Sequence, residues 1–509
     1  MLAQIQSGAV VGLDAVPVTV EVDIASLGLP SFTIVGLPDK AVEESRERVR
    51  AAIKNSGAEF PAKRITVNLA PADLPKVGPA YDLPIALGIL YASGQLGIIP
   101  KDAVFVGELS LDGSVRHTNG VLPLAMLVTK MHGEKNLFVP ISDAREAAII
   151  KEIHVYGVPS LLALFHHLSA TKLIARETHV SFTKVVGSQA FESDMADIQG
   201  QEHAKRALEI AAAGGHNLFM QGPPGAGKTM LARTLPSILP SLTEDEALEV
   251  TKIYSVTGNL PPGESVMKFR PFRSPHHTTS RIGLIGGGTH PSPGEISLAH
   301  RGVLFLDEFP EFPRNVLEAL RQPMEDGVVS ISRAVGSVRY PAKFMLIAAA
   351  NPCPCGNSGS ETRRCTCLPG MVLRYQKRVS GPIIDRIDLH VHVPTVATEK
   401  LTDTSTKNES SAHIRIRVQK ARDRQTKRLH RFALRANAEM PTRVVRECCP
   451  LSPECEQFLR LAVTKFRLTA RGYYRVTKVA RTIADLSGDT VISVPHIAEA
   501  LQYRPIEET

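Results

Sequence analysis

A segment near the middle of the chain has the residue types of a phosphate-binding loop. It follows the strand-like run 217–221 and opens a segment with helical periodicity, which argues against an ordinary turn rich in glycine and proline. Glycines allow backbone N–H groups to close around phosphate oxygens, and the following helix start adds a positive dipole end. We expect Lys228 to reach the β- and γ-phosphates of ATP and the Thr229 hydroxyl to ligate Mg²⁺. The predicted nucleotide-binding residues are Gly222, Pro223, Pro224, Gly225, Ala226, Gly227, Lys228, Thr229, Met230 and Asp307.

Two adjacent carboxylates follow a second apolar run, 303–306. Runs that are apolar throughout are typical of buried parallel strands, and ligands bind beyond the carboxyl ends of such strands. Asp307 suits Mg²⁺ held through water, and Glu308 suits the base that polarises the attacking water. A solvated turn is the alternative for such a pair. Together with the phosphate-binding loop, the pair predicts ATP hydrolysis.

A third apolar run, 343–350, ends at Asn351. We expect the amide of Asn351 to orient the same water molecule. An asparagine at a strand end is also a common turn former, so this residue alone is a weak signal.

Four of the seven cysteines form two Cys-x-Cys pairs shortly after Asn351. Four thiolates on a short loop can close a tetrahedral Zn²⁺ site, and the binding energy orders the loop. We expect a structural zinc ion here, with free thiols or a redox pair as the alternatives. The predicted ligands, within the loop 353–367, are Cys353, Cys355, Cys365 and Cys367.

The elements that must position these residues divide the chain into four parts. Residues 1–185 alternate strand-like and helical runs, which predicts an α/β domain. Residues 190–394 form a second α/β segment that carries the nucleotide motifs. Residues 395–411 are polar and predict a linker, and residues 412–509 are helical by period and rich in arginine.

Positive charge is concentrated at the C-terminal end. The chain carries a net charge of +8, and residues 1–400 have 39 basic and 39 acidic residues, so the excess lies in residues 401–509. The segment 414–435 has nine lysines and arginines against one acid, more than we expect one subunit to pair internally. This favours a nucleic-acid-facing or inter-subunit surface. A solvated helical face is the alternative.

Composition also limits the cellular setting. No apolar run reaches the roughly 18–20 residues that a membrane span needs, so no membrane partner is expected. The N-terminus lacks a basic region and carries Asp14 and Glu21, which argues against a signal peptide. The low cysteine content indicates a reducing compartment, and we expect a cytoplasmic protein.

The order of these motifs resembles that of AAA+ ATPases. The segment 197–201 is similar to the segment that cups adenine in that superfamily. The stretches 270–280, 294–308 and 380–390 resemble the magnesium-chelatase-like branch, and within it the bacterial YifB/ComM family. The resemblance extends from about residue 10 to residue 503 and implies an AAA+ core with a parallel sheet and a helical C-terminal lid.

The resemblance also implies roles for arginines. Arg386 matches the arginine finger offered to the ATP of a neighbouring subunit, although alone it would fit a surface salt bridge. Arg471, at the start of a lid helix, matches sensor 2, with Arg475 as the alternative. A finger acting between subunits requires a ring, and the superfamily implies a hexamer.

Residues 64–86 resemble the proteolytic domain of Lon, which implies an S5 domain 2-like fold for the N-terminal domain. In that family a nucleophilic serine follows the Gly-Pro pair and a lysine serves as its base. Here Ala80 follows Gly78-Pro79, and Leu122 occupies the lysine position. Neither side chain can attack a carbonyl or take a proton, so the peptidase chemistry is not implied. Ring packing and nucleic-acid contact both remain open as roles for this domain.

Further segments are candidates for contacting a polymer. The glycine-rich tip 282–288 and a hairpin over 328–339, turning at Val335-Gly336, match elements that point into the ring's pore in this branch. An ordinary surface hairpin is the alternative. His276 and His277 are interpreted as loop contacts or DNA-facing residues rather than metal ligands. The cations expected to touch phosphates are Arg333, Arg339 and Lys343.

The resemblance therefore implies a hexameric motor that depends on ATP and Mg²⁺ and acts on single-stranded and branched DNA. The family role is a helicase that promotes branch migration in natural transformation. A motor subunit for Mg²⁺ insertion into a porphyrin is the main alternative, and the Lon-like domain and cysteine loop argue against it. Ala80 and Leu122 argue against a protease, and Glu308 and Arg386 argue against an adaptor that only binds nucleotide.

Overall fold

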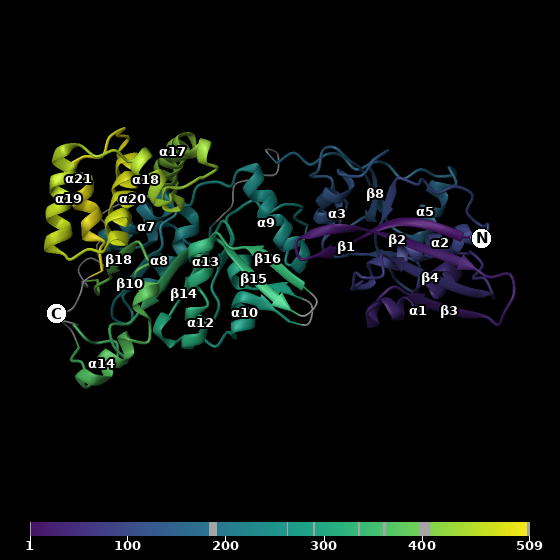
Figure 1. Cartoon of the computed structure of the whole chain (residues 1–509), viewed down its shortest axis with the longest axis horizontal. Helices are drawn as coiled ribbons and strands as arrows, with labels where there is room; N and C mark the ends of the chain where they lie inside the picture. Colours follow the sequence, from purple (N-terminus) through teal and green to yellow (C-terminus); the bar gives the residue numbers. More distant parts are fainter. Residues whose placement is uncertain are drawn as a thin grey trace. The chain divides into compact units, whose positions relative to one another are not determined.

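The computed structural model describes residues 2–182, 191–261, 263–288, 291–333, 336–359, 363–396 and 408–505 (Figure 1). The chain forms two compact units. Unit 1 comprises Met1–Gly187 and Glu244–Lys268, and unit 2 comprises Ser188–Thr243 and Phe269–Thr509. The segment 244–268 therefore interrupts the predicted nucleotide-binding part and packs with the N-terminal part, an exchange that the division into consecutive segments did not anticipate.

Unit 1 is built on a mixed seven-stranded sheet. Its strands are β1 (Leu2–Val11), β2 (Asp14–Ile24), β3 (Ser31–Val35), β4 (Arg64–Ala70), β5 (Ala103–Phe105), β8 (Asn136–Pro140) and β9 (His154–Val158). The order across the sheet is β3-β4-β2-β1-β5-β8-β9. The pairs β1–β2 and β2–β4 are antiparallel and the other neighbours are parallel. A short hairpin joins β6 (Glu108–Leu109) to β7 (Val115–Arg116).

Five helices of unit 1 bury apolar residues against this sheet, namely α1 (Lys40–Asn55), α2 (Asp82–Ala92), α3 (Val121–Val128), α4 (Ala144–Ala147) and α5 (Leu161–Leu168). A further helix, α9 (Glu244–Thr257), packs on α3. Helix α2 is apolar on nearly all sides, and a Cβ at Gly88 would lie 2.5 Å from the Val22 side chain. Close approach of α2 to the sheet therefore requires glycine there. Leu122, which we expect at the position of the Lon lysine, is fully buried on α3.

Helix α9 is fastened to unit 1 by a buried carboxylate. The Ser255 hydroxyl on α9 and the Leu122 N–H both donate to Glu146 Oε1, at 2.6 and 2.8 Å. Burial raises the pKa of Glu146 to about 7, although the two hydrogen bonds oppose this shift. The Gly120 N–H also donates to the Ser255 carbonyl at 3.0 Å, so α9 is an integral part of this unit.

Unit 2 contains a five-stranded parallel sheet, as the apolar runs of the sequence predict. Its strands are β10 (Leu218–Gln221), β11 (Phe272–Arg273), β14 (Val303–Leu306), β17 (Met345–Ala350) and β18 (Leu389–His392). The order is β11-β14-β17-β10-β18 and every pair is parallel. Strands β14 and β17 are buried along their whole length, which explains their lack of polar residues.

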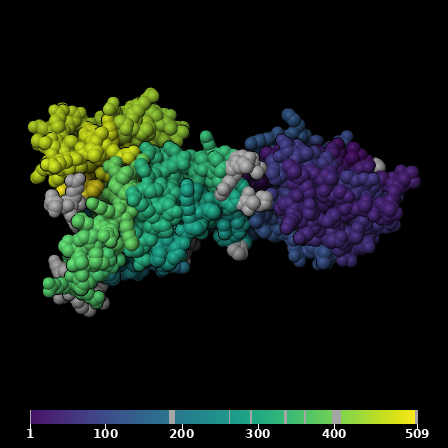
Figure 2. All heavy atoms as spheres, turned by 60° about the horizontal axis from the view of Figure 1, so that its bottom comes forward, coloured from purple at the N-terminus to yellow at the C-terminus, as the bar shows by residue number. Residues whose placement is uncertain are grey.

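Helices around this sheet belong to two groups. Those within the core are α7 (Glu202–Gly214), α8 (Lys228–Thr234), α10 (Arg281–Ile285), α11 (Glu295–Leu298), α12 (Arg314–Glu318), α13 (Arg321–Asp326), α14 (Pro369–Gln376) and α15 (Gly381–Ile384). The C-terminal group comprises α17 (Ser411–Leu429), α18 (Thr442–Cys448), α19 (Pro453–Lys465), α20 (Ala470–Ser487) and α21 (Val494–Gln502). Helices α7 and α8 share one hydrophobic core with the C-terminal group, and the space-filling view shows the C-terminal helices on one side of unit 2 (Figure 2). Within the described residues, no helix is long and apolar enough to cross a membrane.

The two predicted polymer-contacting segments are only partly as expected. Strands β15 (Val328–Arg333) and β16 (Gly336–Pro341) form the antiparallel hairpin, with Arg333 opposite Gly336. Gly336 therefore lies in a strand, whereas Val335 lies outside the described residues. The segment 282–288 is helical to Ile285 and then forms β12 (Gly286–Gly287), which pairs with β13 (Ser292–Pro293).

The nine cations of 414–435, which we expect cannot all be paired within one subunit, divide into seven arginines with partners in the described chain and two lysines without one. Helix α17 ends at Leu429, and the arginines reach acceptors on several other elements. Arg422 donates to the carbonyls of Ala212 and Ala213, both at 3.1 Å, and Arg417 pairs with Glu209 at 2.9 Å. The remaining paired cations are Arg415, Arg424, Arg428, Arg431 and Arg435.

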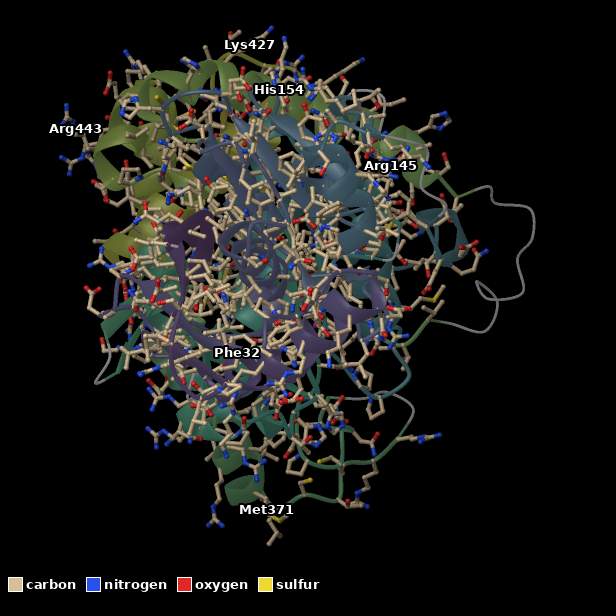
Figure 3. The ribbon with its side chains drawn as sticks, turned by 90° about the vertical axis from the view of Figure 1, so that its right-hand side faces the viewer. Phe32, Arg145, His154, Met371, Lys427 and Arg443 are labelled. Atoms are coloured by element: carbon tan, nitrogen blue, oxygen red, sulfur yellow. The ribbon has the colours of Figure 1, made fainter. Side chains whose placement is uncertain are left out.

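Two lysines of this helix do face solvent. Lys420 and Lys427 are exposed and form no hydrogen bond or ion pair with the described residues. Figure 3 shows Lys427 at the outside of the ribbon. Most of the positive charge of this segment therefore serves hydrogen bonds and ion pairs within the protein.

Asp485 is the acceptor that joins the C-terminal helices. Its side chain is 1% exposed and accepts hydrogen bonds from Arg428 at 2.6 and 2.8 Å, from Arg481, and from the Asn437 amide at 2.9 Å. It therefore bridges α17, α20 and the loop between α17 and α18.

Replacing Asp485 with alanine should destabilise the protein by about 3–5 kcal/mol, because the buried Arg481 and the partly buried Arg428 lose their counter-charge. Asp489→Ala is the control, since that carboxylate is 58% exposed and, among the residues that the structure describes, pairs only with His496, so its loss should cost at most about 1 kcal/mol. Denaturant unfolding midpoints measure both changes. Equal midpoints for the two variants would contradict the role given to Asp485.

Candidate functional site

The loop between β10 and α8 has the backbone of a phosphate-binding loop. Gly225 and Gly227 have φ angles of 77° and 88°, a conformation that strains residues with a side chain. A Cβ at Gly222 would lie 2.1 Å from the Val393 carbonyl oxygen. The glycines of the motif are therefore required by the shape of the loop.

Lys228 lies within this loop and contacts Asn351. Its Nζ donates to the carbonyls of Gly222 and Pro223 at 2.7 and 2.9 Å, and to Asn351 Oδ1 at 3.1 Å. Burial lowers the pKa of Lys228, while the charge of Asp307 opposes the shift. Neutral oxygens are weaker partners for an ammonium than a phosphate is, so the lysine is ready to exchange them for one.

The two predicted Mg²⁺ ligands are in direct contact. The Thr229 hydroxyl donates to Asp307 Oδ2 at 2.7 Å, and the other carboxylate oxygen accepts from the Glu308 N–H at 2.9 Å. A hydroxyl and a carboxylate are hard oxygen donors, the type that Mg²⁺ prefers in sites that also hold phosphate. The donor set therefore fits this ion.

Glu308 projects from the end of β14 with a contact that the sequence did not predict. Its backbone φ is 50° and its side chain is 54% exposed. His277 Nδ1 lies 3.1 Å from Glu308 Oε2. The sequence predicts only a loop contact or a DNA-facing role for His277. The parallel pairing of β11 with β14 brings the histidine to this carboxylate, and no local spacing in the sequence signals that contact.

The segment predicted to cup adenine touches the phosphate-binding loop. Gln201 Nε2 donates to the Ala226 carbonyl at 3.3 Å and to the Pro394 carbonyl at 2.5 Å. The segment 197–201 is thus tied both to the loop and to the residues after β18.

Arg386 and Arg471 are brought together, but not at this site. Both pair with Glu325, and Arg471 also pairs with Asp385 at 3.3 Å. Arg475 is 8% exposed and donates to the Ile387 carbonyl at 2.9 Å, so its guanidinium is used inside the fold. Of the two candidates for sensor 2, Arg471 is the one with an exposed side chain.

The topology explains why these arginines are separate from the loop. Arg386 precedes β18, whereas the phosphate-binding loop follows β10, its parallel neighbour. A four-residue strand is about 13 Å long, so Arg386 and the phosphate-binding loop lie at opposite ends of these two neighbouring strands. The structure therefore joins Lys228, Thr229, Asp307, Glu308 and Asn351, and leaves Arg386 and Arg471 outside that group.

The four predicted zinc ligands converge. Their sulfur atoms lie within 4.8 Å of one another, and three of the distances are 3.4, 3.6 and 3.8 Å. Sulfurs at about 2.3 Å from a tetrahedral Zn²⁺ are about 3.8 Å apart, so the cluster fits the ion. Backbone hydrogen bonds at Asn357 and Thr366 lower the pKa of Cys355, whereas burial and the neighbouring thiols raise the pKa values of Cys365 and Cys367. A bound cation would offset the repulsion among four close thiolates.

The cysteine loop packs directly on the phosphate-binding loop. A Cβ at Gly356 would lie 2.4 Å from Pro224 Cδ. The loop also begins two residues after Asn351, which contacts Lys228. Order in the cysteine loop therefore supports the nucleotide-binding residues from two sides.

We expect purified protein to carry about one zinc ion per chain, and Cys353→Ser with Cys365→Ser to lose it. The loop should then become more protease-sensitive, because bound metal no longer orders it. Elemental analysis and limited proteolysis measure these changes. Cys448→Ala, outside the cluster, should keep the zinc. Chelator-free protein without zinc would leave the thiols free or redox-active.

Comparisons with known proteins agree with this geometry. Residues 194–401 match the family model described as magnesium chelatase, subunit ChlI, and residues 408–504 match the C-terminal model of the same subunit. Residues 20–143 match a third model, described as subunit ChlI of Mg-chelatase.

Full-length relatives are also found. The chain is 45% identical to competence protein ComM of Haemophilus influenzae, over 99% of this chain and 97% of that protein. It is 45% identical to YifB of Escherichia coli and 43% identical to YifB of Salmonella typhimurium, with the same coverage. With this identity over its whole length, the chain belongs to the YifB/ComM family of magnesium-chelatase-like AAA+ ATPases.

Proposed function

We propose that this protein is an ATP-driven motor that acts on DNA and promotes branch migration of recombining strands during natural transformation. The contact of Lys228 and Asn351 beside the Thr229–Asp307 pair is the observation that carries the ATPase part. The DNA part is supported by the relative from Haemophilus influenzae, which bears the name competence protein. Competence is the ability of a cell to take up DNA.

The residues of the site would divide the chemistry among them. Mg²⁺, when bound, neutralises charge on the β- and γ-phosphates. Thr229 and Asp307 would hold it, directly and through water, and Lys228 would exchange its carbonyl partners for phosphate oxygens. Glu308 would polarise the attacking water, with Asn351 orienting the same water. The contact with His277 would hold the Glu308 carboxylate in position.

The position of the arginines supports action between subunits. A guanidinium stabilises the transition state only where charge develops on the transferred phosphoryl group. Arg386 and Arg471 are separated from their own phosphate-binding loop by the length of the sheet, so a neighbouring subunit would have to supply them. We propose a homo-hexameric ring, with both arginines of one subunit facing the ATP of the next.

The remaining assignments complete this proposal. Residues 1–185 would form a Lon-like domain without peptidase activity, and residues 412–509 would form the lid. The cysteine loop would hold a structural zinc ion. The setting would be cytoplasmic.

A motor subunit of a metal-insertion complex is the second candidate. The matched family models, described as magnesium chelatase subunit ChlI, favour it. The high identity to a full-length competence protein favours the DNA motor.

Glu308→Gln should retain ATP binding, because Lys228 and Asp307 remain, and should lose turnover by at least about 10²-fold through loss of water activation. Steady-state phosphate release and nucleotide titration measure the two properties. Glu454→Gln, an exposed substitution on α19, should leave both unchanged. Wild-type turnover in Glu308→Gln would show that another group activates the water.

The DNA proposal is tested with purified full-length protein, ATP, Mg²⁺ and labelled three- and four-stranded junctions. We expect strand displacement that requires hydrolysis, DNA-stimulated ATP turnover, and binding that weakens steeply with salt as counterions are released. Glu308→Gln should bind the junctions without displacing strands. Absence of binding and displacement at low salt would contradict the DNA motor while leaving the ATPase assignment intact.

A further inference from the structure

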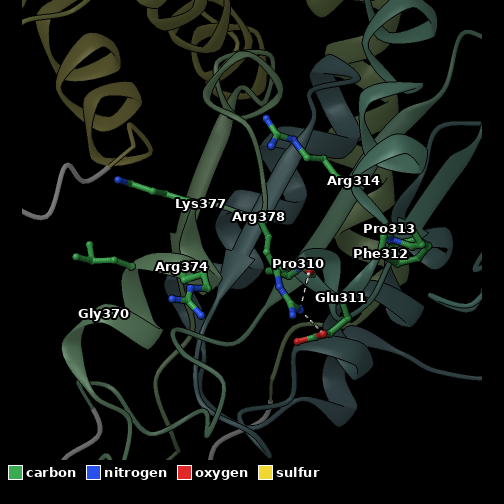
Figure 4. A pocket seen from close by; sticks show the side chains of 10 residues that line it. Pro310, Glu311, Phe312, Pro313, Arg314, Gly370, Arg374, Lys377 and Arg378 are labelled. Atoms are coloured by element: carbon green, nitrogen blue, oxygen red, sulfur yellow. Dashed lines mark hydrogen bonds and ion pairs between the residues drawn. The ribbon is translucent and has the colours of Figure 1, made fainter.

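A second feature of unit 2 is an open cleft of about 790 Å³. One wall is the segment 310–314, which begins two residues after Glu308. The other wall is the segment 370–378, which includes most of α14 and follows the cysteine loop. Figure 4 shows side chains from both walls in this region. The cleft is distinct from the phosphate-binding loop, none of whose residues line it.

The charge of the lining is strongly positive. Its charged residues are one acid, Glu311, and four cations, Arg314, Arg374, Lys377 and Arg378. Arg378 is paired, because its guanidinium donates to Glu311 Oε2 at 2.5 Å. The side chains of the other three cations are exposed and form no hydrogen bond or ion pair with the described residues. Arg314 acts only at longer range, in lowering the pKa of Glu318.

A cleft lined by unpaired cations favours binding of a polyanion. Unpaired cations gathered in one cleft repel one another, and an anion that approaches several of them gains free energy from each. The remaining lining is apolar, from Pro310, Phe312, Pro313 and Leu373, and offers side-chain donors only from the cations. A base-specific or peptide-specific site would present neutral donors and acceptors as well.

We propose that this cleft binds the phosphate backbone of DNA, with Arg374 and Lys377 as its principal contacts. The apolar residues would pack against sugars, and the cations would contact successive phosphates without reading sequence. This inference rests on the proposed DNA-motor function and names a contact surface for that polymer. The surface is separate from the pore elements considered above.

The two walls also connect the cleft to the hydrolytic residues. The wall that carries Glu311 continues directly from Glu308, at the end of β14. On the other wall, Tyr375 is buried on α14 near the backbone of Asn351, directly after β17: burial raises the pKa of the Tyr375 phenol and the Asn351 backbone opposes this shift. A phosphate that draws Arg378 away from Glu311 therefore acts on segments that hold both Glu308 and Asn351. The cleft thereby couples DNA binding to ATP turnover.

The first test uses a full-length double variant that carries both Arg374→Ala and Lys377→Ala. This variant is compared with the wild-type protein. Binding to a labelled duplex is measured between low and moderate salt. The slope of log K against log salt should become shallower by about 0.7–0.9 for each lost phosphate contact, and DNA stimulation of ATP turnover should fall. Arg443→Ala with Arg460→Ala is the matched control. The side chains of both arginines are exposed and form no hydrogen bond or ion pair within the described chain.

Glu311→Gln provides a second variant with the opposite expectation. It releases Arg378 for a phosphate, so DNA affinity should rise and the salt slope should steepen by about one contact. Thermal unfolding establishes that each variant is folded. If both variants have the wild-type salt slope, the proposal that the cleft binds DNA is wrong, while the proposed DNA-motor function still stands. Failure of wild-type protein to bind DNA would instead overturn the proposed function and this inference with it.

Discussion

The parallel pairing of three short strands is the constraint on which the nucleotide site depends. Strand β17 lies between β10 and β14, with Gln221 opposite Ala350 and Leu306 opposite Ala348. Because the strands run in the same direction, the residues that follow them emerge at one edge. Lys228, Asp307 and Asn351 are therefore neighbours although 123 positions separate the first from the last. A shift of one residue in β17 would reverse the faces of its side chains and move Asn351 away from Lys228.

Much of this arrangement was predictable because its signals are local. Strands β14 and β17 are buried on both faces, so their sequences are apolar throughout and mark their own positions. The phosphate-binding loop requires glycine at fixed positions, so its conformation can be predicted from a short stretch of sequence. The two Cys-x-Cys pairs likewise lie close enough along the chain for their convergence to be expected. In each case, one short segment carries the information.

The features that were missed depend on residues far apart in sequence. Helix α2 is buried on nearly all sides, so it lacks the amphipathic period by which helices are recognised. The internal partners of the α17 arginines could not be predicted because the acceptors lie elsewhere in the chain, Asp485 on α20 and the carbonyls of Ala212 and Ala213 at the end of α7. The contact of His277 with Glu308 arises only when β11 pairs with β14. Charge counts and spacing contain none of this information.

Residues 244–268 belong to unit 1 although they lie within the ATPase part of the sequence, and this limits where the gene can be divided. The chain passes between the units three times, at residues 187, 243 and 268, so no single boundary separates the N-terminal part from the ATPase part. A shortened gene that begins near residue 188 would still encode α9. Ala247, Val250 and Ile253 of that helix would then lose their apolar partners in unit 1 and favour aggregation. Loss or replacement of the N-terminal unit by recombination would thus need a matching change in the middle of the ATPase sequence, so the two parts are expected to be inherited together.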